Sequence, residues 1–404
     1  MSDALMRRLA EVVVCVGANV QPGQDVVVLA WDVEQAPLVR AVAECAYGHG
    51  ARFVSALYWD AYVKHSRLRH APADTLGFVP DWWEAITTEC VTRRSAVIHL
   101  HAHAPPELFE DIPLERAMRD VMPITPMFWD AVDRGNLAWT VVPGVCPGLA
   151  QAIVGTSEVG RLWEVLAPIL RLDAPDPQAA WREHIARLRD RAALLQERKF
   201  TGLRFRGGGT DLSVGLLAGA QWVTVASQTR WGSQFVSNLP TEEVFTTPDF
   251  RLTEGVVRVT RPLQLARAGR VEGLTLHFEQ GRIIGVEAAL GAERVRAQLA
   301  VDAGAARLGE VALVDGASPV GQSGMVFGHA LIDENATSHI AWGAAYPDTM
   351  PDLPEGREAQ IALGFNRSDI HEDAMIGGPE VDVFGVDQKG VEVPVISADR
   401  WILT

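Results

Sequence analysis

Two histidines and an aspartate toward the carboxyl end of the chain have the residue types and the spacing of metal ligands. His371 and Asp373 lie two positions apart, so their side chains share a face in a strand and diverge in a helix. We therefore expect an extended segment here, which the turn-forming residues 377–379 would end. His339 stands before the apolar residues 340–342, where a buried imidazole needs a partner. A metal ion bound by all three side chains would supply that partner.

Glutamates in two further segments could complete such a site. Glu310 begins a run, 311–314, that has the composition of a buried strand. A glutamate held beside two histidines and an aspartate is best explained by a cation that offsets its loss of hydration. Glu242 and Glu243 open a second polar-then-apolar strand between two prolines. Neighbours in a strand face opposite ways, so only one of this pair can face the site.

Length and composition limit the kind of protein. The chain has 404 residues, which favours two domains over a single core. A hydrophobic content of 48% and a charged content of 22% are typical of a soluble globular protein. With 51 Asp and Glu against 36 Lys and Arg, the formal net charge is -15, which disfavours nucleic acids and anionic membranes as partners. No run of about 18 apolar residues is present, so we expect no membrane span.

The four cysteines, Cys15, Cys45, Cys90 and Cys146, are widely spaced and form no C-x-x-C pair. This pattern predicts buried, reduced thiols in a cytoplasmic protein rather than a disulfide or zinc framework. The first residues also lack the apolar stretch and cleavage site of a secretory signal.

The first part of the chain alternates strands and helices. Runs rich in β-branched residues predict strands at 25–30, 53–58 and 96–101. Apolar residues at helical spacing predict helices at 5–20, 36–47 and 82–92. This alternation indicates a mostly parallel sheet covered by helices. The Pro- and Gly-containing residues 141–148 predict a loop-rich crossing.

Three alternating histidines, His99, His101 and His103, could also line one face of a strand. Prolines follow them at once, and no carboxylate lies at strand spacing beside them. We therefore do not expect a metal site there.

The boundary between the two domains is expected at the proline-rich residues 173–177, just before an Arg-rich helix at 178–199. After that helix, short β-rich runs dominate, and a triple glycine at 207–209 predicts a hairpin turn. The predicted fold class is α/β: an N-terminal α/β domain, 1–177, with a mostly parallel sheet, and a C-terminal β-rich α+β domain, 178–404, which carries the metal site.

Several motifs in order resemble the M29 metallopeptidases, the thermophilic aminopeptidase family, and the resemblance spans nearly the whole chain. These motifs are Pro240-Thr241-Glu242-Glu243-Val244-Phe245-Thr246, Gly309-Glu310-Val311-Ala312-Leu313, Asp333-Glu334-Asn335-Ala336 with Ser338-His339, Ala345-Tyr346-Pro347, and His371-x-Asp373 with Met375-Ile376-Gly377.

The resemblance implies a metallo-aminopeptidase that releases N-terminal residues from short peptides. It implies five ligands of a two-metal centre, Glu243, Glu310, His339, His371 and Asp373, and a catalytic tyrosine, Tyr346. Glu243 is preferred over Glu242 because the position directly before Val-Phe-Thr is the family's ligand. Similar enzymes are homodimers, so a homodimer is expected here.

The chemistry of the ligand set agrees with this resemblance. Five N and O ligands without a thiolate suit zinc, cobalt, manganese or magnesium. Glu310 could bridge two ions roughly 3.5–4 Å apart, with a catalytic role through the water that they share. Two alternatives remain. His339, His371 and Asp373 alone would make the iron site of a ring-cleaving dioxygenase of the related dihydroxypyridine dioxygenase type. The second alternative is a metal-binding scaffold protein without enzymatic activity.

Overall fold

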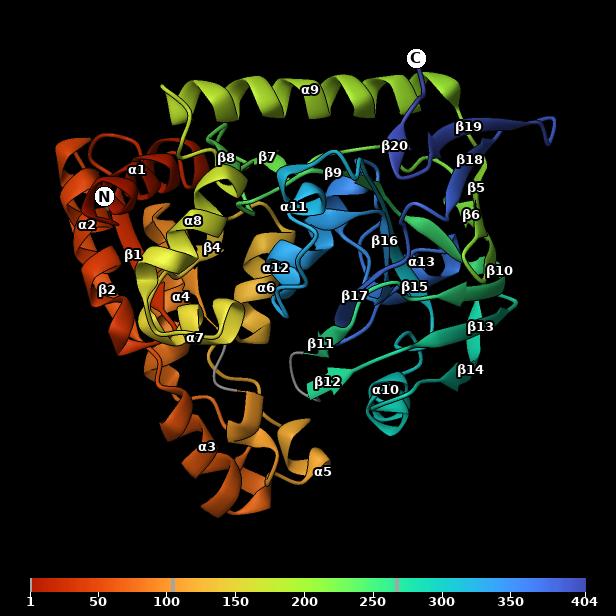
Figure 1. The fold of residues 1–404 in the computed structure, drawn as a ribbon. Coiled ribbons are helices and arrows are strands. Elements are labelled where there is room, and N and C mark those ends of the chain that lie inside the picture. The colour runs from red at the N-terminus through yellow and green to blue at the C-terminus, as the bar shows by residue number, and fades with distance from the viewer. Residues whose placement is uncertain (1, 103–105, 266–268) are drawn as a thin grey trace. The chain divides into compact units, whose positions relative to one another are not determined.

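The computed structural model describes residues 2–102, 106–265 and 269–404, and its chain divides into two compact units (Figure 1). The first unit comprises Met1–Ile185 and Val225–Thr241, and the second comprises Ala186–Thr224 and Glu242–Thr404. The boundary expected after residue 177 coincides with the start of helix α9, Pro177–Arg198, whereas the change of unit falls within that helix. No sequence signal indicated that 225–241 returns to the first unit.

A parallel sheet forms the centre of the first unit, with the strand order β2-β1-β3-β4. Its strands are β1 (Asp25–Ala30), β2 (Phe53–Tyr58), β3 (Ala96–His101) and β4 (Ala138–Pro143). The first three have the predicted bounds. The prediction of a loop at 141–148 is wrong for its first three residues, because β4 extends to Pro143. Proline is tolerated there because β4 is an edge strand of this sheet, so the missing N–H breaks no central ladder.

Helices α2 and α4 contact strands of this sheet, and several other helices precede α9 in the chain. The helices before α9 are α1 (Ser2–Val12), α2 (Ala36–Gly48), α3 (Ala61–His70), α4 (Asp81–Arg93), α5 (Leu114–Ala117), α6 (Pro126–Asp133), α7 (Pro147–Val154) and α8 (Val159–Ile169). The single helix predicted at 5–20 ends earlier, because α1 passes into a π-helical turn at Val13–Gly17. A short hairpin of β7 (Ala226–Gln228) and β8 (Gln234–Val236) completes the unit.

The second unit is β-rich. An eight-stranded antiparallel sheet has the order β14-β13-β10-β6-β5-β18-β19-β20. Its strands are β5 (Gly202–Gly207), β6 (Thr210–Leu216), β10 (Pro248–Arg258), β13 (Thr275–Glu279), β14 (Arg282–Glu287), β18 (Asp382–Val386), β19 (Glu392–Ser397) and β20 (Arg400–Trp401). The triple glycine forms the predicted hairpin turn between β5 and β6.

A second, four-stranded sheet in this unit has the order β17-β16-β15-β9. Its strands are β9 (Glu243–Thr246), β15 (Leu308–Val314), β16 (His339–Gly343) and β17 (His371–Met375). The remaining elements are β11 (Leu263–Leu265), β12 (Gly269–Val271), α10 (Ala292–Leu299), α11 (Pro319–Gln322), α12 (Ala330–Asp333) and α13 (Arg357–Leu363).

The predicted fold class is confirmed: a parallel α/β sheet in the N-terminal part and antiparallel β-rich sheets in the C-terminal part. No helix in the described part of the chain combines the length and the apolar character needed to cross a membrane.

Candidate metal centre

The five predicted ligands all lie on the four-stranded sheet of the second unit. The register pairs Glu310 with Ala341, and Ala341 in turn with Asp373. It also pairs His339 with Ala312. Residues paired across antiparallel strands project from the same face of a sheet. The strand spacing therefore gathers side chains that are far apart in the sequence.

Small residues on this face leave room for the ligands. Ala312 and Ala341 are cross-strand partners of the acidic and histidine side chains, and Gly343 is the partner of His371. A β-bulge between Leu308 and Glu310 shifts the register at the start of β15. A side chain on the intervening Gly309 would lie 2.2 Å from the Ala344 carbonyl oxygen, so only glycine fits. Because a bulge redirects the residues that follow it, this one aims Glu310 at the site.

Two overlapping groups of potential ligands result. Glu243, Glu310 and His339 form one, and Glu310, His371 and Asp373 form the other. His339 Nε2 lies 3.0 Å from Glu243 Oε2 and 3.8 Å from Glu310 Oε1. His371 Nε2 lies 3.3 Å from Glu310 Oε2 and 3.4 Å from Asp373 Oδ1. The two oxygens of Glu310 thus face different histidines.

Backbone carbonyls orient both imidazole rings. His339 Nδ1 lies 3.0 Å from the Glu334 carbonyl oxygen, and His371 Nδ1 lies 2.8 Å from that of Ala344. A carbonyl oxygen can only accept, so each Nδ1 carries the hydrogen. Both Nε2 atoms are then turned toward the carboxylates as ligand atoms, which is the usual arrangement around a metal-bound histidine.

The donor geometry fits a metal ion. Glu243 Oε2 is buried and accepts no hydrogen bond from any described residue, although His339 Nε2 is only 3.0 Å away. Glu243 Oε2 and His339 Nε2 are therefore close together without forming a hydrogen bond, and both could bind the same metal ion. Because Glu243, Glu310 and His339 are each at most 5% exposed, a cation is the partner that would offset their loss of hydration.

The electrostatics also favour a cation. Burial alone would lower the pKa of His339, but the adjacent Glu243 and Glu310 outweigh it and raise that pKa well above its ordinary value. Asp373 and Glu310 do the same for His371. Burial raises the pKa of Glu243. A divalent ion would displace protons from the histidines and interact with the same carboxylates.

Tyr346 lies beside this centre. Its ring centroid is 4.5 Å from that of His371 and 6.0 Å from that of Phe245. The residue as a whole is 37% exposed, so it can also reach a bound molecule. Burial of the hydroxyl and the charge of Glu310 raise the pKa of Tyr346 well above its usual value. The hydroxyl therefore remains a hydrogen-bond donor.

Glu334 is a neighbour that the sequence reasoning did not assign to the site. It is buried in the short turn Glu334–Ala336 that precedes His339. Burial and the negative charges of Asp373 and Glu243 raise its pKa well above the ordinary value. The only sign of this in the sequence was the place of Glu334 in the motif Asp333-Glu334-Asn335-Ala336, shortly before His339.

The other acidic and histidine residues that the sequence singled out lie elsewhere. Glu242 belongs to neither ligand group, and its backbone N–H donates to Asn335 Oδ1. His99 is buried in the first unit, and neither of its ring nitrogens has a hydrogen-bond partner among the described residues. The ring of His101 packs on Trp31, and His103 lies outside the described residues. No metal-ligand group among the described residues includes these histidines.

Comparison with known proteins gives matches along almost the whole chain. A family model described as "Thermophilic metalloprotease (M29)" matches residues 2–401. "Aminopeptidase T" of Thermus aquaticus is 39% identical over 405 residues, with 98% of each chain covered. "Aminopeptidase PepS" of Streptococcus thermophilus is 32% identical over 407 residues, again with 98% of each chain covered. The solved structure titled "Wild-type AmpT from Thermus thermophilus" has a TM-score of 0.88 and 37% identity, and the match covers 98% of this chain and 99% of that one.

Proposed function

This chain belongs to the M29 family of thermophilic metalloproteases and is a metallo-aminopeptidase, and we propose that it releases N-terminal residues from short peptides by means of two divalent metal ions. The family excludes the two alternatives drawn from the sequence, a ring-cleaving dioxygenase and a scaffold protein. The observation that carries the two-ion proposal is the membership of Glu310 in both ligand groups.

Glu243, Glu310, His339, His371 and Asp373 would hold these ions. Glu310 is the residue that both ions would share. Glu243 and Glu310 are buried and Asp373 is half-buried, and together they carry three negative charges, which a single divalent ion cannot neutralise. Because uncompensated buried charge is costly, the charge balance supports a second ion. Nitrogen and oxygen ligands without a thiolate suit zinc, cobalt, manganese or magnesium.

Bound ions would acidify a water molecule and polarise the scissile carbonyl group. The side chains of the protein then have three tasks. Tyr346 donates its hydroxyl hydrogen to the carbonyl oxygen as negative charge develops there. Glu310 and the other carboxylates would hold the ions, and His339 and His371 would complete their coordination through Nε2.

A bound metal ion could also explain why the amino end of a peptide would be chosen. One ion could hold the free amino group of the substrate and so place the first peptide bond at the site. We propose that the substrates are short peptides rather than folded proteins. We also propose that the enzyme is a homodimer. The resemblance to the family supports both proposals. The cysteines in the described residues are all free thiols, which supports a cytoplasmic enzyme.

The test is a comparison between a peptide of about five residues and the same peptide with an acetylated amino end. We expect stepwise release of residues from the free peptide and little cleavage of the acetylated one, because acetylation blocks the amino group that a metal ion would hold. An unfolded protein serves as the third substrate. Rapid cleavage of the acetylated peptide, or cuts within the unfolded protein, would identify an endopeptidase and contradict the proposal.

A further inference from the structure

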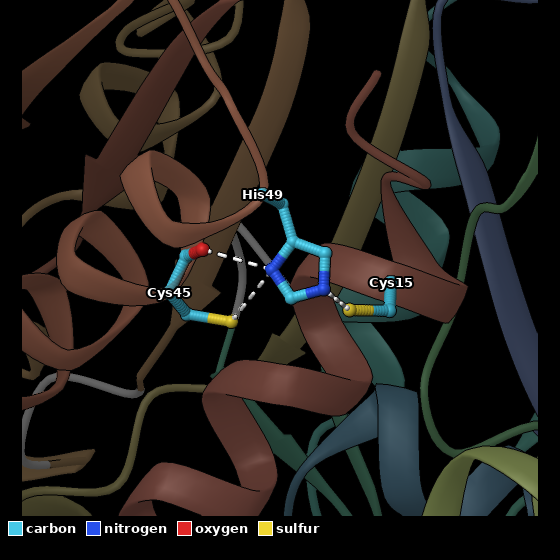
Figure 2. Close-up of side chains that lie close together, drawn as sticks. All are labelled: Cys15, Cys45 and His49. Carbon is cyan, nitrogen blue, oxygen red and sulfur yellow. Dashed lines mark hydrogen bonds between the residues drawn. The ribbon is translucent and has the colours of Figure 1, made fainter. Parts of the chain in front are cut away.

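A third group of potential metal ligands lies in the first unit, away from the residues of the catalytic centre in the sequence. It consists of Cys15, Cys45 and His49, whose side chains face one another in Figure 2. Cys15 lies in the π-helical turn that follows α1. Cys45 and His49 lie four residues apart at the end of α2, so they share one face of that helix. Each residue offers a ligand atom within 4.8 Å of the other two.

The imidazole of His49 is oriented in the same way as the catalytic histidines. Its Nδ1 lies 3.0 Å from the Cys45 carbonyl oxygen, to which it must donate its hydrogen. Its Nε2 then carries the lone pair and lies 3.0 Å from Cys15 Sγ. The Sγ of Cys45 lies 3.7 Å from Nδ1, at the side of the ring. A backbone carbonyl that fixes the hydrogen on one nitrogen is typical of metal-binding histidines.

The surroundings of the cluster permit a metal ion to enter and to bind. Both cysteines are half-buried and His49 is exposed, so the expectation of buried thiols is correct for Cys90 and Cys146 but wrong for Cys15 and Cys45. The hydrogen bond between the two thiols lowers the pKa of Cys15 to about 7 and raises the pKa of Cys45. A bound cation would displace the remaining thiol proton, because cysteine binds metals as the thiolate.

We propose that Cys15, Cys45 and His49 form a second metal site, specific for a soft divalent cation such as Zn²⁺. Thiolate ligands select zinc-like ions, whereas the nitrogen and oxygen ligands of the catalytic centre also suit harder ones. Three protein ligands leave one tetrahedral position for water. The negative charge of Glu11, which influences both thiols, adds to the attraction for a cation. This site does not depend on the proposed two-ion mechanism.

The experiment is a titration of the reduced, metal-free full chain with Co²⁺, followed by absorption spectroscopy. Thiolate ligands give charge-transfer bands in the near ultraviolet, and the nitrogen and oxygen ligands of the catalytic centre do not. We expect these bands in the parent protein, and we expect Zn²⁺ to abolish them by displacement. Cys15→Ala and Cys45→Ala should lose them. Loss of a residue that only orients a metal ligand weakens metal binding roughly 10–100-fold. His49→Ala removes a ligand itself, so it should weaken Co²⁺ binding by more than that.

The matched control is Cys90→Ala, which removes a buried thiol of the same unit outside the cluster and should keep the bands. Circular dichroism verifies that each variant is folded, and the two single cysteine variants test the site independently. The proposal is overturned if the parent protein shows no charge-transfer band, or if Cys15→Ala and Cys45→Ala both bind Co²⁺ with the parent spectrum. A Cys15–Cys45 disulfide that persists in reductant would overturn it as well.

Discussion

Replacement of Tyr346 by phenylalanine tests the catalytic role of one hydroxyl group. Tyr346→Phe keeps the ring, which packs at 4.5 Å from the His371 ring and at 6.0 Å from that of Phe245. The metal ligands should therefore keep their positions. Only the hydrogen bond that the hydroxyl would donate to the developing oxyanion is lost.

The expected magnitude follows from the role of this donor. Loss of one oxyanion donor lowers kcat by about 10²–10³-fold, or about 3–4 kcal/mol. The raised pKa of Tyr346 keeps the donor hydrogen in place across the neutral range, so the full effect should be seen near neutral pH. Because the interaction strengthens only in the transition state, kcat should fall while KM changes little.

The assay measures kcat and KM on a short peptide together with the metal content of the variant. Tyr62→Phe, which alters an exposed tyrosine of the first unit, is the matched control and should behave like the parent. The reasoning would be refuted by a decrease in kcat of less than about tenfold, since this is well below the range for an oxyanion donor. Loss of metal in Tyr346→Phe would refute it too, because the effect would then be structural.

Two further predictions concern single side chains. Glu310→Gln should lose metal and most activity, because both ions would share this carboxylate. The control is Glu372→Gln, which should retain metal and activity. Glu372 lies on the same strand as His371, but its carboxylate accepts a hydrogen bond from Gln298. Equal metal contents in the two variants would contradict the bridging role. His99 is buried, and burial lowers its pKa from 6.5 to about 4. The unfolded chain therefore binds a proton between these values that the folded chain does not, so stability should fall by about 2 kcal/mol from about pH 7 to about pH 5. Urea unfolding of the parent and His99→Phe measures this difference, and equal pH slopes in the two proteins would contradict it.

The sequence predicted correctly those strands whose ends are marked by turn-forming residues or by a change to helical spacing. The strands at 25–30, 53–58 and 96–101 are β-branched runs bounded by turn residues or by helical periodicity, and the structure confirms their bounds. The His-x-Asp spacing likewise predicted the extended segment of β17. Strand β4 was missed because Pro143 and the glycine after it indicate a loop, and only the edge position of β4 makes the proline acceptable.

Other features depend on contacts between distant parts of the chain. The bulge that directs Glu310 toward the histidines requires the close approach of Gly309 to Ala344, which no local pattern reveals. The proximity of Glu334 to the ligand carboxylates arises from the turn that precedes β16. The cluster of Cys15 with Cys45 and His49 arises in the same way from the packing of two helical segments. Spacing in the sequence cannot predict such contacts.

The central claim is that two metal ions, held by ligand groups that share Glu310, perform the hydrolysis. The most direct measurement is a titration of the metal-free Cys15→Ala variant, which lacks the proposed soft-metal site, with zinc, cobalt or manganese. Aminopeptidase activity and bound metal are followed in the same samples. The account predicts that activity is absent without metal and reaches its maximum only when two ions are bound per chain. Full activity with one bound ion, or with none, would contradict it.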